Sequence, residues 1–214
     1  MSAIPGGEFL TGSLDVISQS LTIPVLVILL IIVIISIITL GGAISEFTSR
    51  KKVPIRIIRD LIYEINAAVS VDQLKSIINN AKIPKSQKKV LSEIADSGAL
   101  DETSREALAR KLVEFEEEKI DKTLERTDII TKVGPTLGLM GTLIPMGPGL
   151  AALGAGDINT LASSLTVALN TTIVGIGSGA LCYVIGKVRS GWYDRYLSDL
   201  DALSDAVLDY MNKQ

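Results

Sequence analysis

The side chains that could do chemistry within the apolar parts of this sequence are hydroxyls and one amide. Thr142 lies in one apolar block, and Asn170, Thr171 and Thr172 follow one another in the next. Such groups exchange hydrogen bonds with water or with a carboxylate while staying uncharged themselves. They could line a polar path, but a threonine in an apolar helix can also simply bond the backbone carbonyl four residues earlier.

Groups that carry enzymatic or metal chemistry are scarce. The 214 residues include no histidine, the commonest general base and metal ligand. The single cysteine, Cys182, has no second cysteine with which to form an internal disulfide. A net charge of −3 gives no indication of a nucleic-acid partner. We therefore expect no enzyme activity, no bound metal and no cofactor.

Three blocks of the chain are apolar enough to span a bilayer. Residues 21–45, 133–156 and 161–186 contain no Asp, Glu, Lys or Arg. A helix of about 25 residues reaches roughly 37 Å, and the hydrocarbon core of a bilayer is about 30 Å thick. These blocks predict an all-α integral membrane protein with three transmembrane helices. Residues 157–160 read as a tight turn, which would join the second and third helices in a hairpin.

The basic residues predict one orientation for these helices. Residues 1–45 contain no Lys or Arg, residues 46–132 contain 17, and residues 187–214 contain four. Loops rich in Lys and Arg remain on the cytoplasmic side of a membrane. We therefore expect residues 1–20 and the turn outside a cell (inner or cytoplasmic) membrane, and the loop 46–132 and the tail 187–214 in the cytoplasm.

The loop 46–132 is expected to form a helical domain. Ser70 and Gln73 fit a capping box for a helix that ends near Ala81, and residues 85–95 fit a second short helix. A further capping box at Thr103 is predicted to start a helix that runs unbroken into the second apolar block.

Two surfaces of the predicted cytoplasmic helices stand out. The tail, residues 192–211, carries an apolar stripe suited to packing against neighbouring helices. An acidic run, Glu114 and Glu116–Glu118, lies on the long helix. A solvated face is the ordinary interpretation of such a run, and a docking surface is the alternative.

The second apolar block combines closely spaced glycines with prolines. Gly134 and Gly138 form a GxxxG pair and Gly141 follows, a pattern that lets membrane helices approach closely. Pro145 and Pro148 are predicted to break the helical hydrogen-bond ladder, which is tolerated at membrane depth only against protein or water. We therefore expect this helix to face protein.

The three blocks lack the ionisable group that proton paths in membranes usually contain. If this chain conducts protons, the titrating group must come from another polypeptide.

Two motifs resemble the MotA/TolQ/ExbB proton-channel family. Residues 134–142, GPTLGLMGT, resemble its second-span signature A-P-x-x-G-L-x-G-T, and residues 168–175, ALNTTIVG, resemble A-L-x-x-T-x-x-G in its third span. The ExbB and TolQ branch also has three spans, an outside N-terminus and a large cytoplasmic insertion. Pro145, where many relatives have glycine, and Gly134, where alanine is usual, suggest a distant branch.

The resemblance implies a subunit of a ring, typically a pentamer, whose second and third spans line a pore. A partner of the ExbD/TolR/MotB type would place single-span helices in that pore, and its intramembrane aspartate would carry the proton. The flow would drive a molecular motor that transmits energy across the envelope. Thr142, Thr172, Thr171 and Asn170 would line the path, and Gly134, Pro135, Gly138, Gly141 and Gly175 would serve helix packing.

Two questions stay open on the sequence alone. The chain could instead be a structural membrane scaffold, with a cytoplasmic helical domain that binds a soluble partner. The transported ion could be H⁺ or Na⁺, because a threonine lining does not choose between them.

Overall fold

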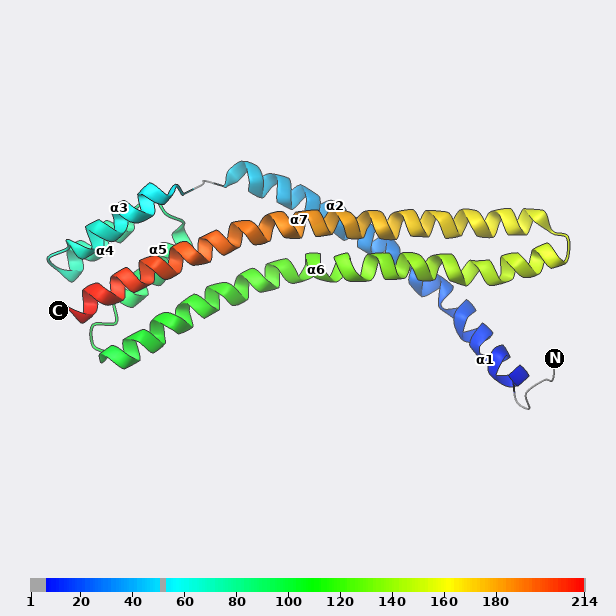
Figure 1. Ribbon diagram of the computed structural model, residues 1–214, viewed down its shortest axis with the longest axis horizontal. Coiled ribbons are helices and arrows are strands. Elements are labelled where there is room, and N and C mark those ends of the chain that lie inside the picture. Colours follow the sequence, from blue (N-terminus) through cyan, green and yellow to red (C-terminus); the bar gives the residue numbers. More distant parts are fainter. Residues whose placement is uncertain (1–6, 51–52, 214) are drawn as a thin grey trace. The chain divides into compact units, whose positions relative to one another are not determined.

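The computed structural model describes residues 7–50 and 53–213, and the chain is helical almost throughout these ranges (Figure 1). No strand occurs among the described residues, which confirms the predicted all-α class. The helices are α1 (Gly7–Ser20), α2 (Thr22–Ser49), α3 (Ile55–Asn66), α4 (Val71–Asn80), α5 (Lys85–Ala95), α6 (Glu102–Gly154) and α7 (Ile158–Asn212).

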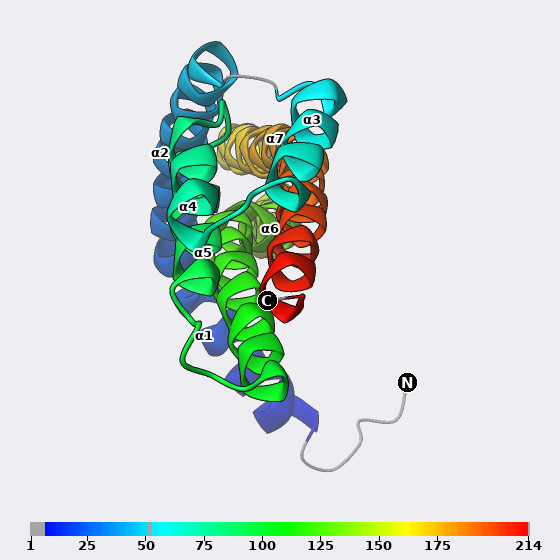
Figure 2. The ribbon, with the colours of Figure 1, turned by 90° about the vertical axis from the view of Figure 1, so that its left-hand side faces the viewer.

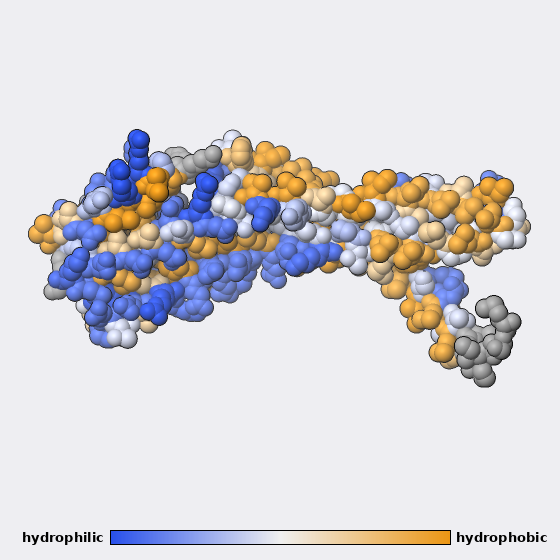
Figure 3. Space-filling view, viewed as in Figure 1, coloured by the Kyte–Doolittle hydropathy of each residue, from blue (hydrophilic) through white to orange (hydrophobic). Residues whose placement is uncertain are grey.

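Three helical stretches are long and apolar enough to cross a membrane. They are Phe9–Ser49, Glu102–Gly154 and Ile158–Asn212. The first and third contain the blocks 21–45 and 161–186 whole, and the second contains the block 133–156 except its last two residues. Many large apolar side chains remain exposed along these blocks, as the orange surface in Figure 3 shows. A soluble monomer rarely exposes so much contiguous apolar surface, whereas a bilayer or a further subunit would cover it.

The chain divides into two compact units, and α6 and α7 each contribute a stretch to both. The first unit comprises Met1–Phe47 and Glu125–Lys187, so it contains α2 and the hairpin formed by α6 and α7. A small cluster of Ile32, Ile130 and Cys182 joins α2 to the hairpin. Val25, Leu29, Ile32 and Ser36 recur at helical spacing and form the buried face of α2.

The hairpin reverses direction over residues 155–157. Gly156 adopts a φ of 82°, a conformation open to glycine. The carboxylate of Asp157 accepts hydrogen bonds from the backbone N–H (3.1 Å) and the hydroxyl of Thr160, and so caps the N-terminus of α7. These bonds lower the pKa of the Asp157 carboxyl. Because of this cap, residues 158–160, predicted to belong to the turn, form the first turn of α7 instead.

Helix α6 is continuous from the second unit through the first. Its length confirms that the helix predicted to begin near Thr103 runs unbroken into the second apolar block. The predicted interruption of the hydrogen-bond ladder at Pro145 and Pro148 does not end the helix, since α6 continues through Pro135, Pro145 and Pro148. Each proline removes one N–H donor from the ladder, and the bonds of its neighbours maintain the helix.

The second unit, Thr48–Leu124 and Val188–Gln214, is built around one apolar core. Figure 2 looks into it: α3, α4 and α5 lie around the adjoining stretches of α6 and α7. The predicted stripe of the tail packs here, which confirms its role in this chain. The fully buried members of the core include Ile65, Leu74, Ile78, Leu91, Ile94, Leu200, Leu203 and Val207.

Two helix starts in the second unit test the predicted caps. The Ser70 hydroxyl accepts from the N–H of Gln73 (3.3 Å), which confirms the cap of α4. The predicted start at Thr103 was wrong, because the Asp101 carboxylate accepts from the Ser104 N–H (3.4 Å) and α6 begins at Glu102. Aspartate caps a helix as well as serine or threonine does.

One matched pair of substitutions tests the core of the second unit. Ile78→Ala should cost about 2–5 kcal/mol of local stability, because it leaves a cavity at a side chain with no exposed surface. Ile55→Ala, at a side chain that is 82% exposed, should cost much less. Amide hydrogen exchange in α4 and α5 of the detergent-solubilised protein measures the difference, and equal effects would contradict this core.

Candidate functional site

The α6–α7 hairpin is held by direct contact between two helix backbones. A Cβ placed on Gly134 would lie 2.9 Å from the carbonyl oxygen of Gly175. A Cβ on Gly175 would lie 2.5 Å from the Gly134 carbonyl oxygen and 2.7 Å from the Cα of Gly138. Neither position has room for a side chain larger than hydrogen, so these three glycines set how closely the helices approach.

The same contact continues in both directions along the hairpin. A Cβ on Gly179 would lie 2.7 Å from the Cδ of Pro135, and one on Gly141 would lie 2.7 Å from the side chain of Thr171. Nearer the turn, a Cβ on Gly149 would lie 2.9 Å from the Cβ of Ser164. Small residues therefore face one another over most of the length of the two apolar blocks.

Two threonine hydroxyls meet across this contact. Thr142 lies one turn beyond Gly138 on α6, and its Oγ1 is hydrogen-bonded to the Oγ1 of Thr172 on α7. Both hydroxyls also lie within reach of two backbone carbonyls. Thr142 Oγ1 is 3.1 Å from Gly138 O and 3.3 Å from Ala168 O, and Thr172 Oγ1 is 3.1 Å from Ala168 O and 3.4 Å from Gly138 O.

More hydrogen-bond acceptors lie within reach of the Thr142 and Thr172 hydroxyls than these hydroxyls have protons to donate. Each hydroxyl carries one proton and two lone pairs, so only two of the contacts around the pair can be occupied at once. One proton can lie between Thr142 and Thr172 while the other goes to a carbonyl. Rotation of a hydroxyl can instead turn that second proton toward a water molecule or a carboxylate. The pair is half-buried and uncharged. It can donate one hydrogen bond to a water molecule or a carboxylate and still keep the hydrogen bond between its two hydroxyls.

Thr171 and Asn170, which were also predicted to line the path, are not part of this hydroxyl pair. Thr171 is 7% exposed, donates to the carbonyl of Ala168 (2.9 Å) and packs on Gly141, so it belongs to the helix contact. Asn170 is exposed on α7. Successive residues of a helix point about 100° apart, and for this reason Asn170, Thr171 and Thr172 cannot share one face.

The set of packing residues predicted from the sequence lacks two glycines of this contact. Gly179 lies against Pro135, and Gly149 lies against Ser164. The spacing of Gly175 and Gly179 was a usable signal, since it repeats the GxxxG pattern of Gly134 and Gly138 on the opposite helix. Gly177 lies between them but has open space around it, which shows that the spacing, and not the number of glycines, determines the contact.

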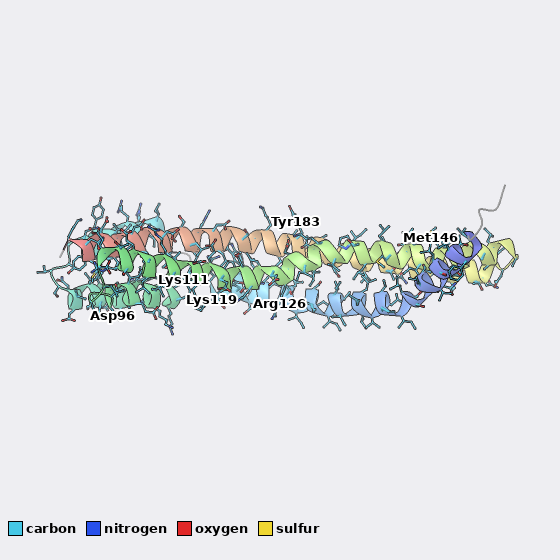
Figure 4. The ribbon with its side chains drawn as sticks, turned by 90° about the horizontal axis from the view of Figure 1, so that it is seen from below. Asp96, Lys111, Lys119, Arg126, Met146 and Tyr183 are labelled. Atoms are coloured by element: carbon cyan, nitrogen blue, oxygen red, sulfur yellow. The ribbon has the colours of Figure 1, made fainter. Side chains whose placement is uncertain are left out.

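The surroundings of the site are apolar and carry no formal charge. Residues 133–156 and 161–186 contain no Asp, Glu, Lys or Arg, and the nearest ion pair on α6 joins Lys132 to Asp128 (2.6 Å). Figure 4 marks the hairpin by Met146, which is half-buried on α6, and by Tyr183, which is 59% exposed on α7. Neither of these two blocks therefore supplies a carboxylate beside Thr142 and Thr172.

A family model described as the MotA/TolQ/ExbB proton channel family matches residues 74–202, more than half of the chain. The chain belongs to this family. The matched residues begin within α4, include all of α6 and end within α7, and they contain the glycine contact and the hydroxyl pair. A search of curated proteins finds no match to the chain. Family membership and the three long apolar helices make this a membrane protein.

The MotA/TolQ/ExbB match does not extend to α2, which lies before residue 74. The matched segment contains the two helices that contact each other through glycine, whereas α2 joins the hairpin through larger side chains such as Ile32. Within this chain, the matched segment therefore contains most of α4, all of α5 and α6, and α7 up to residue 202.

The glycine contact can be tested with a matched pair on one helix. Gly175→Ala should lower the stability of the solubilised protein by about 1–3 kcal/mol, because the new Cβ meets the backbone of α6. Gly177→Ala, with nothing within 4 Å, should be neutral or slightly stabilising, since alanine favours a helix. Thermal unfolding in detergent measures both, and a Gly175→Ala variant as stable as Gly177→Ala would refute the contact.

Proposed function

We propose that this chain is the pore-ring, stator-like subunit of an energy-transducing membrane complex driven by the proton-motive force. Several copies, typically five in this family, surround single-span helices of an ExbD/TolR/MotB-like partner. The hydrogen-bonded pair of Thr142 and Thr172 carries the proposal. It supplies a neutral polar site between two charge-free apolar blocks of a proton-channel family member.

The chemistry of the pair defines what the partner must supply. A threonine hydroxyl does not titrate near neutral pH, and so it cannot itself load and release a proton. It can hydrogen-bond a carboxylate or the water beside it, and such a bond favours the charged form of the acid. The partner's intramembrane aspartate is then the proton carrier, and Thr142 and Thr172 adjust its affinity for the proton.

The orientation is part of the proposal. Residues 1–20 and the turn at Asp157 lie outside the cell (inner) membrane, and residues 46–132 and 187–214 lie in the cytoplasm. The distribution of Lys and Arg supports this placement, since residues 1–45 contain none of the 21. The cytoplasmic segments then contain the second unit with its own apolar core.

A membrane scaffold remains the second candidate, and one observation favours it. Thr142 and Thr172 bond each other and the backbone carbonyls four residues earlier on their own helices, which is all that a packing role would require. A scaffold would show no proton flux with any partner. Flux measurements on vesicles that contain both proteins therefore separate the two functions.

Removal of one hydroxyl tests the proposed path. Thr172→Val keeps the shape of the side chain but removes a hydrogen bond to a charged group, worth about 1.5–3 kcal/mol. We expect roughly tenfold or greater loss of partner-dependent proton flux in vesicles, while Thr172→Ser, which keeps a hydroxyl, should retain most of it. Thr142→Val and Thr142→Ser should behave in the same way.

The control is Thr39→Val on α2, which makes the same chemical change outside the hairpin. If Thr142→Val and Thr172→Val both keep undiminished flux with the partner present, the hydroxyl pair is not on the path.

A further inference from the structure

The second unit contains an acidic cleft between the first part of α6 and the end of α7. Its volume is about 580 Å³. Six carboxylates line it, and Arg110 is the cation among the lining residues. Two of the six carboxylates pair within α6: Glu106 with Arg110 and Glu114 with Lys111. The six are Glu106, Glu114, Glu117, Asp201, Asp205 and Asp209.

Three of these carboxylates form a row of like charges. Asp201, Asp205 and Asp209 follow one another at four-residue spacing on α7, where neighbouring side chains repel each other. Burial, and then the charge of Asp205, raise the pKa of Asp201. Within the described chain no ion pair compensates this row, so a cation from outside would relieve the repulsion.

A second feature of the cleft is a polar group without a partner. Ser204 lines the cleft and is 3% exposed, and its Oγ makes no hydrogen bond. An unsatisfied buried hydroxyl costs free energy, and native structures usually provide it with a partner. Its position among the aspartates indicates that a ligand with hydrogen-bond donors completes this surface.

The predicted acidic run is divided by the fold. Glu114 and Glu117 line the cleft, whereas Glu116 is buried and accepts a hydrogen bond from the hydroxyl of Tyr196 (3.1 Å). Glu118 pairs with Lys122 (2.8 Å). The docking interpretation of the run therefore applies to two of its four members, and both face the aspartates of α7.

The same unit exposes lysines that match this cleft in charge. Lys82 precedes α5, and Lys85 and Lys89 lie one turn apart on its exposed face. None of the three pairs with a carboxylate among the described residues, in contrast to Lys75, which pairs with Asp96. An ammonium group carries three hydrogen-bond donors, which suits both carboxylates and the Ser204 hydroxyl. We call Lys82, Lys85 and Lys89 the lysine face.

We propose that the acidic cleft of one copy of this chain binds the lysine face of a neighbouring copy. The inference rests on the proposed ring. A contact between two different surfaces of one subunit is head-to-tail, and such contacts generate rings when the rotation closes. Charges placed in this way steer neighbouring copies and fix their register more than they add affinity.

Cross-linking of paired cysteines tests the contact. The full chain with Asp205→Cys and Lys85→Cys is treated, in mild detergent, with a short bis-maleimide. Both positions are on the surface, and the native Cys182 is fully buried. A head-to-tail contact should give a ladder of covalent multimers, and each single variant should give none. The matched control, Asp205→Cys with Glu64→Cys, should stay monomeric on a denaturing gel, because Glu64 lies on the exposed side of α3.

Charge reversal separates this contact from accidental proximity. In the same cysteine background, Asp201→Lys with Asp209→Lys should lower the multimer yield about tenfold, because several exposed pairs turn from attraction to repulsion. Adding Lys82→Glu and Lys89→Glu should restore the yield. Circular dichroism of each variant verifies the helical fold.

The outcomes distinguish this inference from the proposed function. A multimer by native mass spectrometry whose cysteine pair cross-links no better than the control would refute the cleft contact and leave the ring intact. A yield that charge reversal does not change would also refute it. A wild-type chain that is monomeric in mild detergents would refute both proposals.

Discussion

The hairpin depends on two helix backbones that touch where side chains would otherwise keep them apart. Gly134 and Gly138 of α6 lie against Gly175 of α7, so close that a Cβ atom on Gly175 would clash with the backbone of α6. Lipid tails are as apolar as leucine, so helix association in a membrane draws on van der Waals packing and hydrogen bonds. The contact also fixes the register, and it is this register that brings Thr142 and Thr172 together. A shift of one residue along either helix would separate the hydroxyls and move side chains into the space that glycine leaves.

Polar chemistry differs between the two units of the chain. In the hairpin it is neutral: hydroxyls and backbone carbonyls, in spans that carry no Asp, Glu, Lys or Arg. A formal charge there would be costly without a partner, because the bilayer offers no water to solvate it. In the second unit the surface is charged, with carboxylates around one cleft and lysines on α5. A neutral lining suits a path whose charge comes from elsewhere, and a charged surface suits contacts made in water.

Much of the helical architecture could be predicted from the sequence, and the features that could not be predicted have physical causes. Apolar blocks without charges gave the three candidate spans, and the Ser70 cap and the helix at residues 85–95 were found correctly. Helix α3 was missed although Ile58, Leu61 and Ile65 recur at helical spacing. The prolines of α6 were expected to interrupt its hydrogen-bond ladder, and the helix nevertheless continues through all three of them. Local pattern alone could not place Thr171 in the glycine contact and Thr172 beside Thr142, because that depends on the register of two helices.

The central claim is that the hairpin provides a neutral lining and requires a carboxylate from a second polypeptide. The direct measurement is proton flux into vesicles that contain this chain alone, the chain with the proposed single-span partner, or the chain with that partner after its membrane aspartate is replaced by asparagine. The account predicts flux in the second preparation and background leakage in the first and third. Flux through the chain alone, or undiminished flux with the asparagine variant of the partner, would contradict it.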